Sequence, residues 1–203
     1  SLKAYQQRTL DELKEFLIDT NKLVSGSRLE PEKALKLTFS LKNESEPYKS
    51  VTEIVNTPYL CIKIPTGGGK TLVASHSLSI IFDNYLQDKN GKGLVLWFVP
   101  SDTIREQTLK NLQDRQHPYR EVIDEKFGKS VKVLTLEEAL SIQKSDLQNN
   151  LCIVVASLQA FRRTDKQWLK VFQNNGALLS HFENLVEDAD FLDKDEDKEV
   201  VYS

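Results

Sequence analysis

The sequence predicts an α/β fold, in which a parallel sheet carries helices on both faces. Two continuous apolar runs, residues 94–99 and 151–156, have the pattern of strands that are buried on both sides. A third apolar run, residues 59–64, leads directly into a glycine-rich turn and then into a helix-like segment. Because such runs alternate with segments of helical periodicity, we expect parallel strands joined by right-handed crossovers.

The N-terminal region is predicted to be helical, with a loop ahead of the first strand. Residues 3–19 place apolar side chains at helical spacing, at Tyr5, Leu10, Leu13, Phe16 and Leu17. A turn is expected at 25–27, where glycine lies between two serines, and a short helix should begin at 30–32, which includes a proline. Residues 43–58 are polar and contain two prolines, so we expect them to be mostly loop.

Strands and helices should then follow in alternation. The first strand is expected at 59–64, and the glycine turn with its helix covers about 65–86. A turn at 88–93 leads to the second strand. Residues 100–102, which read Pro-Ser-Asp, end that strand and cap a helix over 103–113.

The C-terminal half is predicted to continue this alternation. A helix is expected near 119–127, a short strand at 131–134 and a capped helix start at 135–138. Residues 151–156 form the next buried strand, and residues 167–186 have helical character.

Residues 64–71 read Ile-Pro-Thr-Gly-Gly-Gly-Lys-Thr, a composition suited to the phosphates of a nucleoside triphosphate. Gly67–Gly69 lack Cβ atoms, so the backbone can curl with its N–H groups directed at the phosphates. Lys70 would reach the β- and γ-phosphates, the Thr71 hydroxyl would ligate Mg²⁺, and the next helix would offer its N-terminal dipole. The alternative is a glycine-rich surface turn, but such turns lie in polar surroundings and this one lies between two apolar segments.

The motif departs from the strict pattern G-x-x-x-x-G-K-[ST], since Ile64 stands where the first glycine would be. In this form, residues 65–71 resemble motif I of superfamily 2 helicases and translocases. The longer string 58–71 is similar to the ATP-binding segment of the Res subunit of type III restriction enzymes and of related DEAD/DEAH-type helicases. The resemblance implies a RecA-like P-loop NTPase domain that uses ATP and Mg²⁺, and it makes Thr66 a residue that shapes the loop.

Two further segments follow the order of this family's motifs. Ligands of open parallel sheets bind just past the carboxyl ends of the strands, where Ser101 and Ser157 lie. These segments resemble motifs Ia and Ib, which grip a nucleic-acid backbone, and the Pro-Ser…Gln pattern of motif Ia continues to Gln107. A serine at a helix start and the N–H groups behind it can bind a phosphate oxygen, and Arg105 could add positive charge. On residue chemistry alone, the alternative is that Ser101 or Asp102 only caps the helix.

A glutamine near the N-terminus is a candidate for adenine recognition. In the resembling family, a glutamine in a Tyr-Gln context hydrogen-bonds adenine, since its amide supplies both a donor and an acceptor. Tyr5 and Gln6 give that context, and the resemblance assigns the role to Gln6, with Gln7 as a second amide beside it. The alternative for either glutamine is a solvated residue at a helix start.

The motif that should complete an ATPase is missing from these 203 residues. A Walker B strand is apolar and ends in Asp-Glu. Residues 187–199 instead carry eight acidic residues and two lysines, which is typical of a solvated, mobile loop, and residues 200–202 could begin another element. We therefore expect residues 1–203 to be a single, C-terminally truncated RecA-like ATP-binding domain that hydrolyses almost no ATP by itself.

The resemblance implies a parent enzyme that couples ATP hydrolysis to translocation or switching on nucleic acid, with double-stranded DNA as the first expectation. A modification subunit, a methyltransferase, is a further expected partner. Two other classes stay open on the residues alone. One is a P-loop NTPase that does not act on nucleic acid, such as a kinase or a transporter ATPase, and the other is a non-enzymatic module that binds partners through its acidic segment.

Composition and charge are typical of a soluble globular protein, since 39% of residues are hydrophobic, 28% are charged and the net charge is −3. Outside the acidic segment the chain is mildly basic, which permits nucleic-acid contact. No apolar run has the length of a membrane span and no signal-peptide pattern opens the chain, so a cytoplasmic location away from membranes is expected. Cys61 and Cys152 lie in apolar runs and are predicted to be buried thiols, and the three histidines show no metal-ligand spacing.

Overall fold

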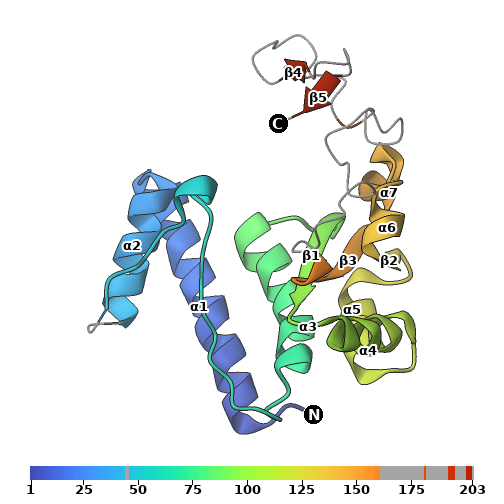
Figure 1. The fold of residues 1–203 in the computed structure, drawn as a ribbon. Coiled ribbons are helices and arrows are strands. Elements are labelled where there is room, and N and C mark those ends of the chain that lie inside the picture. Colours follow the sequence, from blue (N-terminus) through green and yellow to red (C-terminus); the bar gives the residue numbers. More distant parts are fainter. Residues whose placement is uncertain (44–45, 161–180, 182–191, 195–199, 203) are drawn as a thin grey trace. The chain divides into compact units, whose positions relative to one another are not determined.

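The computed structural model describes residues 1–43, 46–160, 181, 192–194 and 200–202. The chain divides into two compact units, Ser1–Lys89 and Asn90–Ser203, and each is described by itself (Figure 1). The first unit is helical and contains the glycine loop. The second contains a parallel sheet flanked by helices, so the expected α/β class is observed.

In the first unit, two helices pack against a long N-terminal helix. α2 (Pro31–Lys42) and α3 (Lys70–Ile81) both contact α1 (Ala4–Ser27), and a π-helical turn, η2 (Phe82–Leu86), extends α3. A 3-10 turn, η1 (Thr52–Ile54), lies within the expected loop. The buried side chains form two clusters, one of Leu13, Phe16, Leu17, Leu35 and Tyr48, and one of Leu10, Ile64 and Val73.

α1 continues through residues 25–27, where the sequence predicts a turn. It ends at Arg28, whose backbone is left-handed (φ 52°, ψ 32°) and whose N–H donates to the Leu23 carbonyl. No atom lies within 4 Å of the position where Gly26 would carry a Cβ. A glycine costs a helix about 1 kcal/mol relative to alanine, so one glycine does not by itself end a helix that is packed along its length.

The strand predicted at 59–64 is absent, and that prediction is wrong. Residues 58–65 form no regular element, most of their side chains are exposed, and only Ile64 is buried. An apolar run becomes a strand only where another strand accepts its backbone hydrogen bonds, and the described part of this unit includes no strand. Cys61 is therefore exposed, contrary to prediction, whereas Cys152 is fully buried as predicted.

The second unit is built on three parallel strands in the order β1-β3-β2. These are β1 (Gly93–Val99), β3 (Leu151–Ser157) and β2 (Val131–Leu134), and both outer strands pair with β3 from Leu151 onwards. All three lie within a residue of the predicted strands. The central strand β3 is buried along its whole length, as its continuous apolar run predicts.

Helices flank this sheet. α4 (Asp102–Gln113) and α5 (Pro118–Phe127) confirm two predicted helices to within a residue. α6 (Leu136–Ala139) begins with the predicted capping box at Thr135. The sequence does not predict α7 (Lys144–Asn149), which is too short to show a hydrophobic period. Among these helices α4, α6 and α7 pack directly against the strands.

β1 is partly buried on one face and exposed on the other, so the prediction of burial on both faces fails for this strand. Leu94, Leu96 and Phe98 are exposed, and they alternate with less exposed residues up to the buried Val99. β1 lies at an edge of the three-stranded sheet. A run of apolar residues does not reveal whether its strand is central or at an edge, because that depends on which strands pair with it.

A buried arginine joins α4, α5 and β2. Arg120 is 3% exposed, and its guanidinium donates to Asp124 Oδ1 (2.7 Å), to the Leu112 carbonyl (2.9 Å) and to the Val131 carbonyl (3.1 Å). A buried charge is tolerated when it is paired and its donors are satisfied, and here one carboxylate and two carbonyls meet that need. Arg120 thus fixes the helices relative to the edge of the sheet.

The C-terminal residues contribute a short antiparallel pair, β4 (Leu192–Lys194) and β5 (Val200–Tyr202). β5 lies where a new element is expected to begin, whereas β4 is a strand inside the segment 187–199 that the sequence predicts to be a loop. The rest of that segment, and the helix predicted at 167–186 apart from His181, lie outside the described residues. No helix in the described part of the chain is both long enough and apolar enough to cross a membrane.

Candidate functional site

The glycine loop begins with a turn over residues 65–68. The Gly68 N–H donates to the Pro65 carbonyl (2.9 Å), and the third residue of the turn, Gly67, has a φ of 74°. A type II turn requires a positive φ at this position, which glycine adopts without steric cost. Gly69 follows with a left-handed backbone (φ 79°, ψ 38°) and is the N-cap of α3. Three glycines therefore carry the chain around the turn and into the helix.

A side chain is disfavoured at each of these three positions, for different reasons. At Gly67 nothing lies within 4 Å of a Cβ position, so only the backbone angle favours glycine. At Gly68 a Cβ would lie 2.8 Å from the Pro65 oxygen, and at Gly69 it would lie 2.5 Å from Gln6 Nε2 on a backbone whose φ is already positive. A loop without side chains leaves its N–H groups accessible to a phosphate, so these residues fit the ligand that the sequence predicts.

The cation of the motif lies across the loop. Lys70 is exposed, and its Nζ donates to the Pro65 carbonyl (3.1 Å), which also accepts the Gly68 N–H. Thr71, half-buried in the first turn of α3, follows directly. An exposed ammonium and a hydroxyl at consecutive helix positions are the groups that phosphate oxygens and Mg²⁺ require, so the donor set also fits.

Two side chains from the start of α1 hold the loop. Tyr5 donates its hydroxyl hydrogen to the Gly68 carbonyl (2.8 Å), and the Gln6 amide donates to the same oxygen (2.8 Å). Gln6 is 4% exposed, and its Oε1 accepts the Lys3 N–H (2.8 Å). We call Tyr5 and Gln6 together the α1 clamp.

The structure separates the two candidate glutamines. Gln7 is exposed and donates to Asp11 Oδ1 (2.9 Å) one helical turn away, which is the solvated arrangement. Gln6 instead lies against the glycine loop, although the amide atoms that the sequence assigns to adenine already bond with the protein. The sequence does not predict that Tyr5 contacts the loop, and the only signal for this contact is the Tyr-Gln pair itself.

In the second unit, the carboxyl ends of β1 and β3 lie side by side. Val99 pairs with Ser157, and the Leu158 N–H donates to the Val99 carbonyl (2.9 Å). The segments that contain Ser101 and Ser157 are therefore adjacent, as the parallel topology predicts. The Ser101 side chain accepts the Ile104 N–H (3.4 Å) and so caps α4, which is the structural alternative for this residue.

The Ser157 side chain is directed into the protein. It is fully buried, its hydroxyl donates to Asp102 Oδ1 (2.5 Å), and its Oγ accepts the Ala160 N–H (3.3 Å). The same Asp102 oxygen lies 3.6 Å from Arg105 Nε. Asp102, which the sequence analysis considered only as a cap, thus joins the two predicted nucleic-acid segments and holds Arg105 beside them.

A match over most of the chain gives the family. Residues 1–188 match the profile of the family described as "Type III restriction enzyme, res subunit". The chain belongs to this family. Its fold is accordingly the N-terminal domain of a superfamily 2 helicase, in the form of a partial RecA-like P-loop domain, and the expected resemblance is confirmed. No curated protein and no solved structure matches the chain significantly.

Membership of the Res-subunit family establishes a helicase-like ATPase family in general. Among the described residues, no group of three or more His, Cys, Asp and Glu side chains could hold a metal ion. The Thr71 hydroxyl in the first turn of α3 is the candidate Mg²⁺ ligand at the glycine loop.

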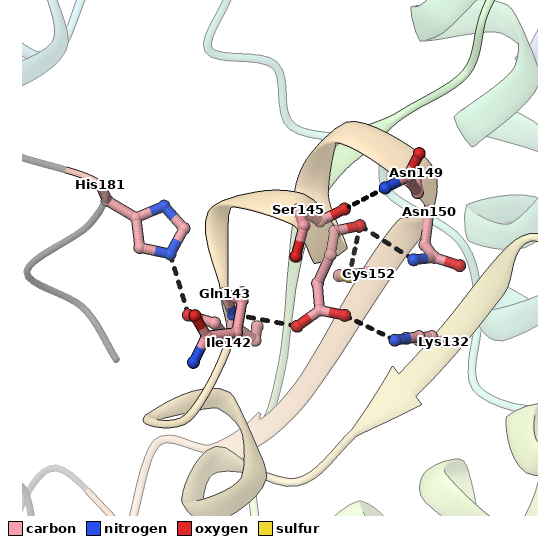
Figure 2. Close-up of polar contacts among 9 residues, drawn as sticks. Lys132, Ile142, Gln143, Ser145, Asn149, Asn150, Cys152 and His181 are labelled. Carbon is pink, nitrogen blue, oxygen red and sulfur yellow. Dashed lines mark hydrogen bonds and ion pairs between the residues drawn. The ribbon is translucent and has the colours of Figure 1, made fainter. Parts of the chain in front are cut away.

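A second polar cluster surrounds Asp146 at the start of α7, and its contacts are structural (Figure 2). Lys132 Nζ lies 2.6 Å from Asp146 Oδ1, and this hydrogen bond holds the pKa of Asp146 below its ordinary value and raises the pKa of Lys132. The other carboxylate oxygen accepts the Gln143 N–H (2.9 Å), and His181 contacts the Ile142 carbonyl (2.9 Å). The carboxylate thus caps α7 and joins it to β2.

Burial determines the reactivity of Cys152, the cysteine in this cluster. The Cys152 thiol is buried in β3, and its sulfur lies 3.9 Å from the Asp146 carbonyl. Burial raises the pKa of the Cys152 thiol, which keeps it protonated and unreactive at neutral pH. Cys152 is therefore not a candidate nucleophile.

Proposed function

We propose that this chain is the ATP-binding part of a DNA-dependent ATPase or translocase of the type III restriction Res kind, with Mg²⁺ as cofactor. The observation that carries the proposal is the glycine loop, in which Gly67 and Gly69 have positive φ, Gly68 has no room for a side chain, and Lys70 and Thr71 follow at the start of α3. Family membership of the chain supports the same conclusion.

The loop residues act on the phosphates by position and charge. Lys70 exchanges the Pro65 carbonyl for a phosphate oxygen and stabilises negative charge on the transferring phosphoryl group. Thr66, at the second position of the turn, shapes the loop, and the Thr71 hydroxyl would hold Mg²⁺. When bound, Mg²⁺ supplies charge neutralisation at the phosphate oxygens. Gln6 recognises adenine in this proposal only by giving up one of its present hydrogen bonds.

Nucleic acid is proposed to bind at the carboxyl ends of β1 and β3. Ser101 lies at the start of α4, where a phosphate oxygen can accept hydrogen bonds from helix N–H groups, and Arg105 lies one turn further on. The Ser157 hydroxyl is buried, so it contributes to this surface indirectly, by holding Asp102 in place. Double-stranded DNA is the proposed ligand, a methyltransferase subunit the proposed partner, and the cytoplasm the proposed location.

The test is the ATPase rate of the natural protein, in the longest form that its gene encodes, with and without double-stranded DNA. We expect DNA to raise the rate severalfold, and Lys70→Ala to abolish it in both conditions. Arg105→Gln should leave the rate without DNA unchanged, and it should reduce the slope of log affinity for DNA against log salt by about one, because one phosphate contact is lost.

A second candidate is a P-loop NTPase of another class that does not act on nucleic acid. It is favoured by one observation, that the Ser101 side chain caps a helix and the Ser157 side chain is buried, so both have structural roles. An ATPase rate that DNA and RNA leave unchanged, but that Lys70→Ala abolishes, would support this candidate and contradict the proposal of a nucleic-acid motor.

A further inference from the structure

One backbone oxygen in the glycine loop accepts two hydrogen bonds from side chains that lie far away in the sequence. The Gly68 carbonyl accepts from the Tyr5 hydroxyl and from the Gln6 amide, each at 2.8 Å, and both donors belong to the first turn of α1. A carbonyl has two lone pairs, so the α1 clamp uses the full acceptor capacity of this oxygen.

This contact determines the direction of the next N–H group. A peptide unit is planar, and in the trans form its carbonyl and its N–H point in opposite directions. The chain has no cis peptide bonds. Holding the Gly68 oxygen toward α1 therefore directs the Gly69 N–H away from α1. This peptide joins two glycines, which without the clamp would rotate more freely than any other pair of residues.

The clamp is itself held in place. Gln6 is 4% exposed, its Oε1 accepts the Lys3 N–H, and its Nε2 lies so close to Gly69 that a Cβ there would be 2.5 Å away. Tyr5 is 38% exposed, so its hydroxyl can be removed without opening a core. The loop is therefore hydrogen-bonded to the start of α1 on one side, while the Lys70 ammonium donates to another of its carbonyls, that of Pro65.

We propose that the Tyr5 hydroxyl, with the Gln6 amide, is a positioning group. It orients the Gly68–Gly69 peptide so that the Gly69 N–H can donate a hydrogen bond to a phosphate oxygen. The proposal rests on the nucleotide-binding function proposed above and adds residues from α1 to it. Its ligand is the polyphosphate of any nucleotide, since the clamp acts on the loop backbone and not on a base. It predicts that Tyr5 affects ligands that have no base at all.

The decisive variant is Tyr5→Phe, which removes one hydroxyl and keeps the ring. Dissociation constants for ATP, GTP and inorganic tripolyphosphate, each with Mg²⁺, should all rise by a similar factor of about three to ten, as expected for loss of one neutral hydrogen bond. Tyr59→Phe is the matched control, because Tyr59 is 56% exposed and lies outside the loop, and its dissociation constants should equal those of the wild type.

A readout in the ligand-free protein separates positioning from simple stabilisation. The Gly69 amide signal in a nitrogen-15 NMR spectrum, recorded well below the melting transition, should shift and broaden in Tyr5→Phe, even if the lost hydrogen bond also lowers the melting temperature. Gln6→Met, which keeps the length of the side chain but removes both amide atoms, should weaken the binding of tripolyphosphate as well as that of ATP. If Gln6 acts on adenine alone, Gln6→Met will instead lower the preference for ATP over GTP and leave tripolyphosphate unchanged.

The outcomes distinguish this inference from the function on which it rests. Normal tripolyphosphate binding by Tyr5→Phe, in a protein whose binding Lys70→Ala abolishes, overturns the clamp and leaves the nucleotide site intact. Absence of ATP and tripolyphosphate binding by the wild type overturns both. A lower melting temperature with unchanged dissociation constants and an unchanged Gly69 signal also overturns it, because the hydroxyl would then only stabilise the fold.

Discussion

Replacing Gly69 by alanine is expected to destabilise the first unit by more than its backbone angle alone explains. A left-handed backbone costs an L-residue about 1–2 kcal/mol, and this cost applies equally at Gly67, where φ is 74° and nothing lies near the Cβ position. At Gly69 the new methyl would lie 2.5 Å from Gln6 Nε2 and would push that amide away from the Gly68 carbonyl.

The prediction compares the free energies of unfolding of Gly69→Ala and Gly67→Ala. A net hydrogen bond contributes about 0.5–1.5 kcal/mol, so Gly69→Ala should lower the free energy of unfolding by roughly 1.5–3.5 kcal/mol and Gly67→Ala by roughly 1–2 kcal/mol. Gly26→Ala is a control of opposite sign, since Gly26 lies in the last turn of α1 in open space. It should be neutral or stabilising by up to about 1 kcal/mol.

Urea unfolding followed by far-UV circular dichroism measures all three variants, because the first unit is built from helices. Equal destabilisation by Gly69→Ala and Gly67→Ala would contradict this expectation, since the Gln6 amide would then not occupy the space beside Gly69. Nearly wild-type stability of both variants would show that the loop does not need a positive φ at either glycine.

Three further predictions concern the second unit and the cysteines. Arg120→Met should lower the free energy of unfolding by about 3–5 kcal/mol, because a partly buried carboxylate and two carbonyls lose the donor that a buried guanidinium supplies; a loss below about 1 kcal/mol in urea unfolding would contradict this. The hydrogen bond from Lys132 lowers the pKa of Asp146. This bond therefore stabilises the fold fully at any pH above the ordinary carboxyl pKa, and its contribution is lost as the pH falls through the lowered pKa. The melting temperature of Asp146→Asn should therefore fall less steeply than that of the wild type under acid, and parallel curves would contradict the assignment. A thiol reagent should modify Cys61 quickly in the folded protein and Cys152 only after unfolding, and rapid modification of both would show that β3 is not buried.

The sequence predicts those elements whose signals are local. The three strands of the sheet, α4 and α5 lie within a residue of their predicted positions, because apolar runs, caps and turn residues mark them in the chain itself. The failures depend on pairing. Residues 59–64 have the composition of a strand, but without a neighbouring strand they form none. Residues 94–99 form a strand that is covered on one face only, because it lies at an edge.

In the candidate site, too, contiguous residues can be predicted from the sequence, whereas contacts between distant residues cannot. Gly67–Gly69, Lys70 and Thr71 can be found from the sequence because they are contiguous. The contact of Tyr5 with Gly68 joins residues 63 positions apart, and that of Ser157 with Asp102 joins residues 55 apart. No local pattern encodes such contacts, so the clamp on the loop, and the buried rather than exposed position of Ser157, could be learned only from the folded chain.

The glycine loop is proposed to bind the phosphates of ATP, and the dissociation constant of Mg²⁺-ATP decides whether it does. Isothermal titration of Mg²⁺-ATP into the 203-residue chain should show binding that Lys70→Ala weakens by roughly 10- to 100-fold, the effect of losing a charge-assisted hydrogen bond. Lys63→Ala, a change of another exposed lysine just ahead of the loop, should bind as the wild type does. Equal affinities in all three proteins, or no binding by the wild type, would contradict the assignment of this loop as the nucleotide site.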